Sequence, residues 1–302
     1  MANLKEIRVR LASIKSTRQI TSAMKMVSAA KLRKAQDAIL QMRPYANKLQ
    51  EILVNLTASI DEPEDNIYGT VRDVKRALIV LVSSNKGLCG AFNANVAKEA
   101  IRLIENDYAE LRGSDSIHVL AIGKKAGELL RSKKYNVHME KHELFDSHSY
   151  DGVAEVAESI MKAFAEGEYD EVKIIYNQFR NAATQDLTVE QYLPIAPQVE
   201  EEEEEEDIHG EHETTRVDYI LEPSREYIVR ELIPKSLKIQ LYKAFLDSNA
   251  SEHGARMTAM HKATDNATEL IKNLQLEYNK ARQASITKEI LEIVGGAEAL
   301  SS

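Results

Sequence analysis

Two heptad patterns, one at each end of the chain, constrain the fold more than any other feature of the sequence. From Leu4 onward, apolar residues recur every three or four positions, the spacing at which one helix packs along another. Pro44 is the only helix breaker here and is expected to bend the helix after about Met42. Asp61-Glu62-Pro63 is expected to end it. The N-terminal seam consists of Leu4, Ile7, Leu11, Ile14, Arg18, Thr21, Lys25, Ser28, Leu32, Ala35, Ile39, Met42, Ala46, Leu49, Leu53 and Leu56.

A second seam follows Pro234, which suits a first helical turn, and is expected to end at Gly295-Gly296, a possible left-handed cap. At 1.5 Å per residue, helices over 1–60 and 234–296 would be roughly 85 and 90 Å long. Ordinary core packing could explain either seam alone, but one small domain cannot cover both. The sequence therefore predicts an antiparallel coiled coil. Its C-terminal seam is Ile239, Tyr242, Leu246, Asn249, His253, Arg256, Met260, Ala263, Ala267, Leu270, Leu274, Glu277, Ala281, Ala284 and Leu291.

The middle of the N-terminal seam is polar. Arg18 and Lys25 could set the helix register, extend their charges to water, or face an acidic partner. A shifted apolar stripe of Ile20, Met24 and Val27 accompanies them. Such a shift indicates that the helix rotates relative to its partner or meets a different partner there.

Charge is unevenly distributed along the 302 residues. Residues 1–60 carry 11 Lys or Arg against 3 Asp or Glu, whereas residues 61–233 carry 19 against 37. The basic end favours an acidic partner, but nucleic acid is disfavoured because the acidic middle repels phosphate and stacking aromatics are scarce. No apolar run is long enough to cross a bilayer, and no signal or transit segment is recognisable. The single cysteine, Cys89, excludes an internal disulfide.

Residues 72–230 read as a Rossmann-like α/β domain with a mostly parallel sheet. Buried-strand runs cover 76–84, 116–123 and 171–179, and further strands are expected at 186–195 and 217–221. A helix is expected at 91–109. A short helix follows the second strand and ends at 131, and a third helix is expected at 152–165. The acidic segment 198–213 is interpreted as a solvated loop.

No active site is recognisable. The turn containing Lys86, Gly87, Leu88, Cys89 and Gly90 lies between a strand and a helix, where phosphate binders place glycine-rich loops. It matches neither phosphate-binding motif, so a tight turn with a packed cysteine is favoured. His138 and His142 have the spacing of ligands on a helix without a third ligand, and His209 and His212 lie in the acidic loop. We therefore expect no catalytic residue, metal or cofactor.

Five motifs together make the chain resemble the gamma subunit of F-type ATP synthases, and the resemblance covers nearly the whole length. The motifs are ITSAMKMVSA at 20–29, RPY at 43–45, SSNKGLCG at 83–90, YNKARQA at 278–284 and ITKEILEIVGGAEA at 286–299.

The resemblance implies a central-stalk rotor, itself non-catalytic, whose coiled coil turns inside a hexamer of α and β subunits. Its α/β domain would contact the epsilon subunit and the ring of c subunits, without inserting into the membrane. Proton flow through that ring would drive ATP synthesis on β, or ATP hydrolysis would pump protons.

By the same resemblance, Arg18, Met24 and Lys25 would contact an acidic lever of β, and Arg282 and Gln283 another β loop. The turn from Lys86 to Gly90 would lie near epsilon and the c ring. With a single cysteine, the chain lacks the redox-switching dithiol pair of chloroplast members. No mitochondrial targeting segment is evident, so the cytoplasmic face of a bacterial plasma membrane is the expected location.

Two other classes of function remain open on the residues alone. The middle domain could be a small-molecule or nucleotide-binding enzyme that uses the coiled coil to oligomerise, with its site near Lys86 to Gly90. Alternatively, the chain could be a coiled-coil scaffold for an acidic protein.

Overall fold

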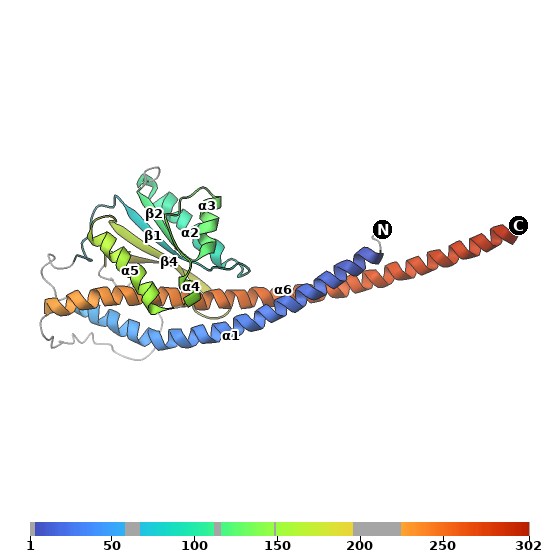
Figure 1. The fold of residues 1–302 in the computed structure, drawn as a ribbon, viewed down its shortest axis with the longest axis horizontal. Coiled ribbons are helices and arrows are strands. Elements are labelled where there is room, and N and C mark those ends of the chain that lie inside the picture. The colour runs from blue at the N-terminus through green and yellow to red at the C-terminus, as the bar shows by residue number, and fades with distance from the viewer. Residues whose placement is uncertain (1–3, 58–66, 112–115, 148, 196–224, 302) are drawn as a thin grey trace, which may run out of the picture. The chain divides into compact units, whose positions relative to one another are not determined.

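The computed structural model describes residues 4–57, 67–111, 116–147, 149–195 and 225–301. The chain divides into two compact units, Lys31–Ala255 and Met1–Ala30 with Arg256–Ser302. Two long helices, α1 (Leu4–Thr57) and α6 (Arg225–Ser301), each contribute to both units (Figure 1).

The Lys31–Ala255 unit, called the α/β unit below, is built on a five-stranded sheet in the order β3-β2-β1-β4-β5. The first four strands in that order are parallel, and β5 pairs with β4 antiparallel. This arrangement confirms the predicted α/β fold with a mostly parallel sheet. The strands are β1 (Ala77–Val82), β2 (Ile117–Ile122), β3 (Met139–Lys141), β4 (Glu171–Phe179) and β5 (Gln185–Leu193).

The central strand β1 reads ALIVLV and is buried on both faces, as expected when helices cover both sides of a parallel sheet. Alternate residues Ala77, Ile79 and Leu81 pack in one core with apolar residues of the next two helices. Those helices are α2 (Phe92–Arg102), which continues through a π-helical turn at Leu103–Asp107, and α3 (Lys124–Ser132). Figure 1 places α5 (Tyr150–Ala165) away from α2 and α3.

The order of the strands reverses beside β1. The chain proceeds from β1 to β2 and β3 on one side and then returns to place β4 on the other. In open α/β sheets, ligands bind at such a reversal, outside the carboxyl ends of the strands. The carboxyl ends of β1 and β4 are therefore the place to look for a site in this unit.

Two short elements were not predicted from the sequence, because neither is long enough to show the periodic spacing of apolar residues. They are β3 and α4 (Leu144–Ser147). Strand β3 lies between His138 and His142, so the interpretation of these two as ligands on one helix is wrong. The strand expected at 217–221, the acidic segment 198–213, and His209 and His212 lie outside the described residues.

Within this unit, α1 and α6 run antiparallel. Ala46 and Leu49 of α1 pack with Ile239 of α6, while Arg43 contacts Asp247, so rising numbers on one helix meet falling numbers on the other. The helix α1 continues through Pro44. Proline's fixed φ is compatible with a helix, although its ring removes one backbone hydrogen bond and crowds the preceding turn.

In the unit formed by Met1–Ala30 and Arg256–Ser302, the helices are again antiparallel. Arg8 Nη2 donates to Tyr278 Oη at 3.0 Å, and the hydroxyls of Thr21 and Thr264 lie 2.8 Å apart. The predicted coiled-coil pairing is thus confirmed. The predicted C-terminal seam was wrong in two places. Ile271 is buried where Leu270 was expected and Leu270 is 46% exposed, and Leu291 at the end of the seam is 66% exposed.

The helix α6 is longer than the sequence predicted. It begins at Arg225, nine residues before Pro234, where the sequence analysis placed its first turn. It also continues through Gly295 and Gly296, neither of which adopts the left-handed conformation of a cap. Glycine permits such a cap without requiring it, and the alanines and leucine that follow favour helix. The domain limits 1–60, 72–230 and 234–296 stay predictions.

Candidate partner-binding surfaces

The polar stretch of α1 presents two different faces. Thr21 and Ser28 are buried at 8% and 3% exposure, and the Thr21 hydroxyl donates to the Arg18 carbonyl at 3.1 Å. Arg18 is exposed, and Met24 and Lys25 are half-buried. Small hydroxyl residues thus occupy the seam towards α6, and the basic side chains lie at its margin.

The shifted stripe does not turn towards α6. Ile20 and Val27 are 58% and 57% exposed, and Met26 between them is 65% exposed. Rotation of α1 towards α6, one of the two interpretations of the stripe, is therefore wrong for Ile20 and Val27, whereas Met24 of the same stripe is half-buried. A different partner at this level stays a prediction, and grouped exposed apolar side chains are typical of interaction surfaces.

Arg282 and Gln283 lie exposed on α6, several turns beyond the Thr21–Thr264 contact. At 1.5 Å per residue, Arg282 lies roughly 27 Å along α6 from Thr264. The structure therefore does not bring Arg282 together with Met24 and Lys25. The two groups form separate surfaces at different levels of one helix pair.

Beyond Gln283, the end of α6 is apolar yet exposed. The exposed residues there are Ile286, Ile290, Leu291, Ile293 and Val294, at 48–71%. Grouped exposed apolar side chains of this kind are typical of interaction surfaces. Among the described residues, no helix has the length and apolarity needed to cross a membrane.

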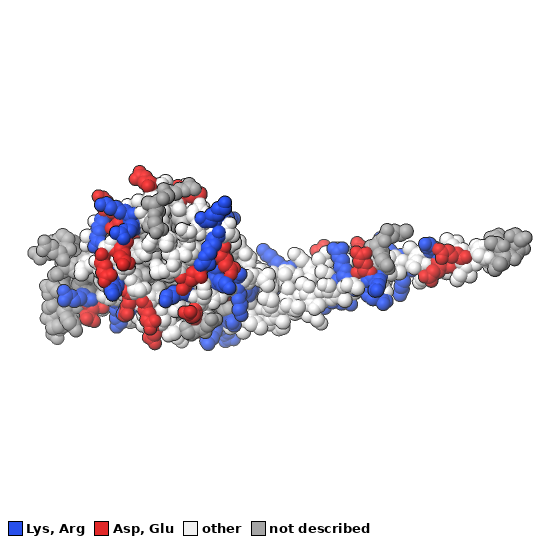
Figure 2. Space-filling model, turned by 45° about the horizontal axis from the view of Figure 1, so that its top comes forward, with Lys and Arg blue, Asp and Glu red and all other residues white. Residues whose placement is uncertain are grey.

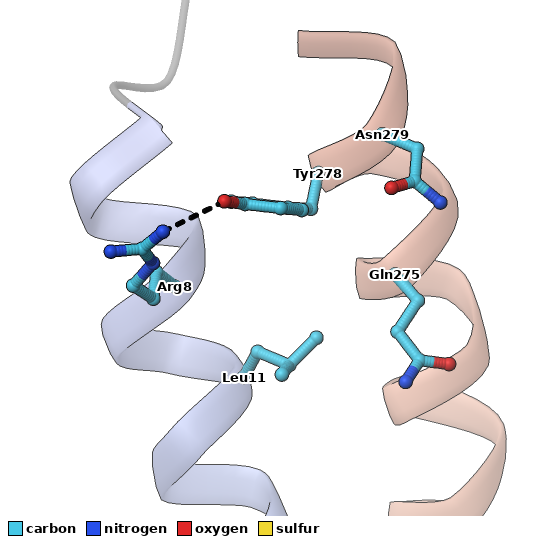
Figure 3. Close-up of a pocket in the computed structure, with 5 residues that line it drawn as sticks. All are labelled: Arg8, Leu11, Gln275, Tyr278 and Asn279. Carbon is cyan, nitrogen blue, oxygen red and sulfur yellow. Dashed lines mark hydrogen bonds between the residues drawn. The ribbon is translucent and has the colours of Figure 1, made fainter. Parts of the chain in front are cut away.

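A groove of about 400 Å³ lies between α1 and α6 in the unit formed by Met1–Ala30 and Arg256–Ser302 (Figure 3). It is lined by Arg8, Leu11, Gln275, Tyr278 and Asn279. The Arg8 guanidinium is 5.9 Å from the centre of the Tyr278 ring, whose hydroxyl it also bonds. These five lining residues include no nucleophile paired with a base.

In the other unit, the turn after β1 is held by its own side chains. Asn93 Nδ2 donates to Ser84 Oγ at 2.8 Å and to Cys89 Sγ at 3.1 Å, and Ser84 Oγ donates to the Lys86 carbonyl at 2.7 Å. Asn93 was missed in the sequence because it lies beyond the glycines, in the first turn of α2. These polar groups bond one another and stabilise the turn, as the tight-turn interpretation expected.

The turn displays an apolar side chain. Leu88 is 66% exposed and has φ of 63°, while Cys89 is buried at 2% and Gly90 has φ of 62°. Lys86 is exposed and Gly87 is half-buried beside it. A non-glycine residue in the left-handed region is uncommon and marks a turn whose shape is imposed by its surroundings.

The crevice at the carboxyl ends of β1 and β4 is occupied by α6. Ser248 Oγ donates to the Val82 carbonyl at the end of β1 at 3.3 Å. A Cβ on Gly254 would lie 3.2 Å from the Ala182 carbonyl oxygen, just beyond β4. The helix backbone therefore lies directly against the position where a dinucleotide would bind in a Rossmann fold.

His138 and His142, noted in the sequence, have local partners. His118 and His138 stack with ring centres 4.1 Å apart, and His142 Nε2 lies 2.9 Å from Glu140 Oε2. Within the described ranges, no three His, Cys, Asp or Glu side chains form a group that could hold a metal ion.

Charged side chains are mixed on the α/β unit. Figure 2 shows Lys and Arg interspersed with Asp and Glu over the face in view, without a continuous basic surface there. A nucleic-acid interface requires clustered positive charge, so this face does not suit one.

Comparison with known proteins gives a consistent result. Residues 3–300 match the protein family described as ATP synthase. The chain is 53% identical over 302 residues to the ATP synthase gamma chain of Cytophaga hutchinsonii, and 56% identical over 301 residues to that of Flavobacterium johnsoniae. All of this chain and all of each relative are covered.

A solved structure agrees in fold. The central stalk and c-ring structure of the Tetrahymena thermophila mitochondrial ATP synthase contains a chain that is 25% identical, with a TM-score of 0.56. The match covers 81% of this chain and 99% of that one.

Proposed function

The chain belongs to the family of ATP synthase gamma chains, and we propose that it transmits rotation between a membrane ring and catalytic β subunits. The observation that carries this proposal is identity above 50% to gamma chains along the full length of both proteins. The paired helices and the α/β unit are the two parts that such a transmission requires.

The physical requirement is a stiff connection. One charge that crosses 100 mV releases about 2.3 kcal/mol, so several charges must be summed before ATP can be made. The energy has to reach a distant site as rotation. Two helices with a continuous seam resist twisting better than a jointed chain, and the antiparallel pairs at Arg8–Tyr278 and Thr21–Thr264 belong to such a seam.

The exposed apolar end of α6 supports an enclosing partner. Leu291 and Ile293 are 66% and 71% exposed, which a partner surface would cover. We place this end inside the α and β hexamer. Arg282 and Gln283 then contact one β loop, and Arg18, Met24 and Lys25 contact an acidic segment of β at another level.

The turn from Lys86 to Gly90 is proposed to face the epsilon subunit and the c ring. Leu88 supports this role, because a rigid turn holds its apolar side chain outward. The complex would then lie at the cytoplasmic face of a bacterial plasma membrane, with this chain as a peripheral subunit.

We also propose that the chain has no catalytic activity of its own. The alternative, a nucleotide-binding enzyme with its site near Lys86, requires an open crevice at the ends of β1 and β4. The helix α6 occupies that place through Ser248 and Gly254, which favours the rotor over the enzyme.

Co-expression with the α and β chains of the same organism tests the proposed function. A complex with one copy of this chain per hexamer that hydrolyses ATP is the expected result. A chain that elutes alone from size exclusion, with the hexamer assembled without it, would refute the rotor role.

Exchange of single side chains tests the proposed contacts. Arg282→Ala is expected to weaken ATP-driven proton pumping in the reconstituted complex while leaving the chain folded, because Arg282 is exposed. Lys272→Ala is the matched control, since Lys272 is exposed on the same helix. Equal pumping by both variants and the unmodified complex would contradict the Arg282 contact.

A further inference from the structure

The motif Arg43-Pro44-Tyr45 has no role in the proposed contacts with partner subunits, yet Arg43 lies where three parts of the chain meet. One nitrogen, Arg43 Nη2, donates to Asp247 Oδ1 at 3.1 Å and to the Phe179 carbonyl at 3.0 Å. Asp247 belongs to α6, and Phe179 is the last residue of β4. Arg43 therefore connects α1, α6 and the sheet through a single group.

The two charges lie in different surroundings. The Asp247 side chain is fully buried, whereas that of Arg43 is 38% exposed. Burial raises the pKa of Asp247, and the nearby Arg43 opposes this rise. In the described part of the chain, the second carboxylate oxygen, Oδ2, has no hydrogen-bond partner. Arg43 is thus the main compensation for a buried charge.

Stability alone does not explain such a pair. Two apolar residues of similar volume often stabilise a protein as well as a buried ion pair does, because the charges lose their hydration. What the pair adds is direction, since hydrogen bonds require a particular geometry and apolar contacts do not. A directional contact resists sliding of one surface over another.

Several described contacts join α6 to the rest of this unit. Tyr192 Oη donates to the Leu237 carbonyl, Ser248 bonds the end of β1, and Phe145 packs on Phe245 with ring centres 4.8 Å apart. All of these reach α6. The bond from Arg43 to the Phe179 carbonyl joins α1 directly to the sheet.

We propose that Arg43 is a positioning residue that holds the helix pair in a fixed rotational register on the α/β sheet. Torque applied to the sheet then passes to α1 and α6 without slippage. This inference rests on the proposed rotor function and adds to it the residues through which one part of the rotor grips the other. Asp247 and the Phe179 carbonyl are the two acceptors of that grip.

The decisive variant is the double substitution Arg43→Met and Asp247→Leu. It removes both charges, so no buried carboxylate is left unpaired and the fold is expected to keep its stability. The bond to the Phe179 carbonyl is lost as well. Two quantities are measured, namely the unfolding midpoint of the purified chain and the protons pumped per ATP hydrolysed by the complete complex in proteoliposomes.

The proposal expects an unfolding midpoint at or above that of the unmodified chain, together with a loss of protons pumped per ATP. Arg43→Lys is expected to recover part of the pumping, because an ammonium group has three donors for the same two acceptors. A double variant that pumps as well as the unmodified complex would overturn the proposal.

Glu158→Gln is the matched control. It removes an exposed ion pair between α5 and α6, that of Glu158 with Lys238, and leaves the contacts of Arg43 intact. Unchanged pumping is expected, since exposed pairs contribute little. If Glu158→Gln lost as much pumping per ATP as the double variant, the loss would not be specific to the contacts of Arg43, and the proposal would be overturned. Failure of the unmodified chain to join the hexamer would instead refute the rotor function itself.

Discussion

Replacement of three glycines by alanine, one at a time, should produce three different effects on stability although all three belong to the same end of the sheet. Gly87 and Gly90 lie in the turn after β1, and Gly123 lies between β2 and α3. A Cβ at Gly87 or Gly90 would meet no atom within 4 Å. A Cβ at Gly123 would lie 2.0 Å from the Ser83 carbonyl oxygen.

The backbone conformations separate the three further. Gly87 is outside the left-handed region, so alanine there should stabilise the fold by about 0.4–1 kcal/mol, because alanine lowers the conformational entropy of the unfolded chain. Gly90 has φ of 62°, which costs alanine about 1–2 kcal/mol and leaves a small net loss. Gly123 has φ of 93° and ψ of 154°, a region that essentially only glycine occupies, at about 1–3 kcal/mol.

At Gly123 the steric overlap adds to the cost of the dihedral angles. Ser83 cannot move freely, because its N–H donates to the Ile122 carbonyl at 2.8 Å and its Oγ accepts from the Ala126 N–H at 3.2 Å. Loss of these bonds costs about 1 kcal/mol each. Gly123→Ala should therefore destabilise the fold by about 3–5 kcal/mol in total.

Urea unfolding followed by near-ultraviolet circular dichroism measures these differences in the α/β unit. The chain has 12 tyrosines and no tryptophan, and Tyr108, Tyr176 and Tyr192 are buried in this unit. The expected order of stability is Gly87→Ala, then Gly90→Ala, then Gly123→Ala. Equal stability of Gly123→Ala and Gly87→Ala would refute the steric and conformational argument.

Three further predictions concern the helices. Ile271→Ala should lower the free energy of unfolding by about 2–3 kcal/mol and Leu270→Ala by less than about 0.5, because only Ile271 is buried in the seam. Thermal unfolding followed at 222 nm measures both, and a larger loss for Leu270→Ala would support the seam predicted from the sequence. Tyr192→Phe should lose about 1 kcal/mol, measured by urea unfolding, with the bond to the Leu237 carbonyl. Because burial raises the pKa of Asp247, the folded chain keeps a proton that the unfolded chain has already released, so stability should fall as the pH rises through that pKa. Asp247→Asn should not show this fall in stability, and urea unfolding midpoints of both chains from about pH 4 to pH 8 test the difference. The same pH dependence in both chains would contradict the prediction.

Local patterns determined much of this protein. The heptad spacing from Leu4 to Leu49 predicted a long helix and most of its buried face, because helical packing repeats every three or four residues. The runs at β1, β2 and β4 predicted the parallel sheet for a similar reason, since strands covered on both faces are continuously apolar. The motif at 286–299 indicated the family, which the comparisons confirm.

Other features depend on residues that are far apart in the sequence. Arg43 meets Asp247 and Phe179 only when α1, α6 and β4 are assembled, and nothing in the local spacing of these residues pairs them. The occupation of the crevice by α6 likewise follows from the close approach of Gly254 to Ala182. The sequence by itself therefore determined the helices, the strands and the family, because these follow from local periodicity and motif. Only the tertiary structure decided what each buried face packs against, because these neighbours are far apart in the order of residues.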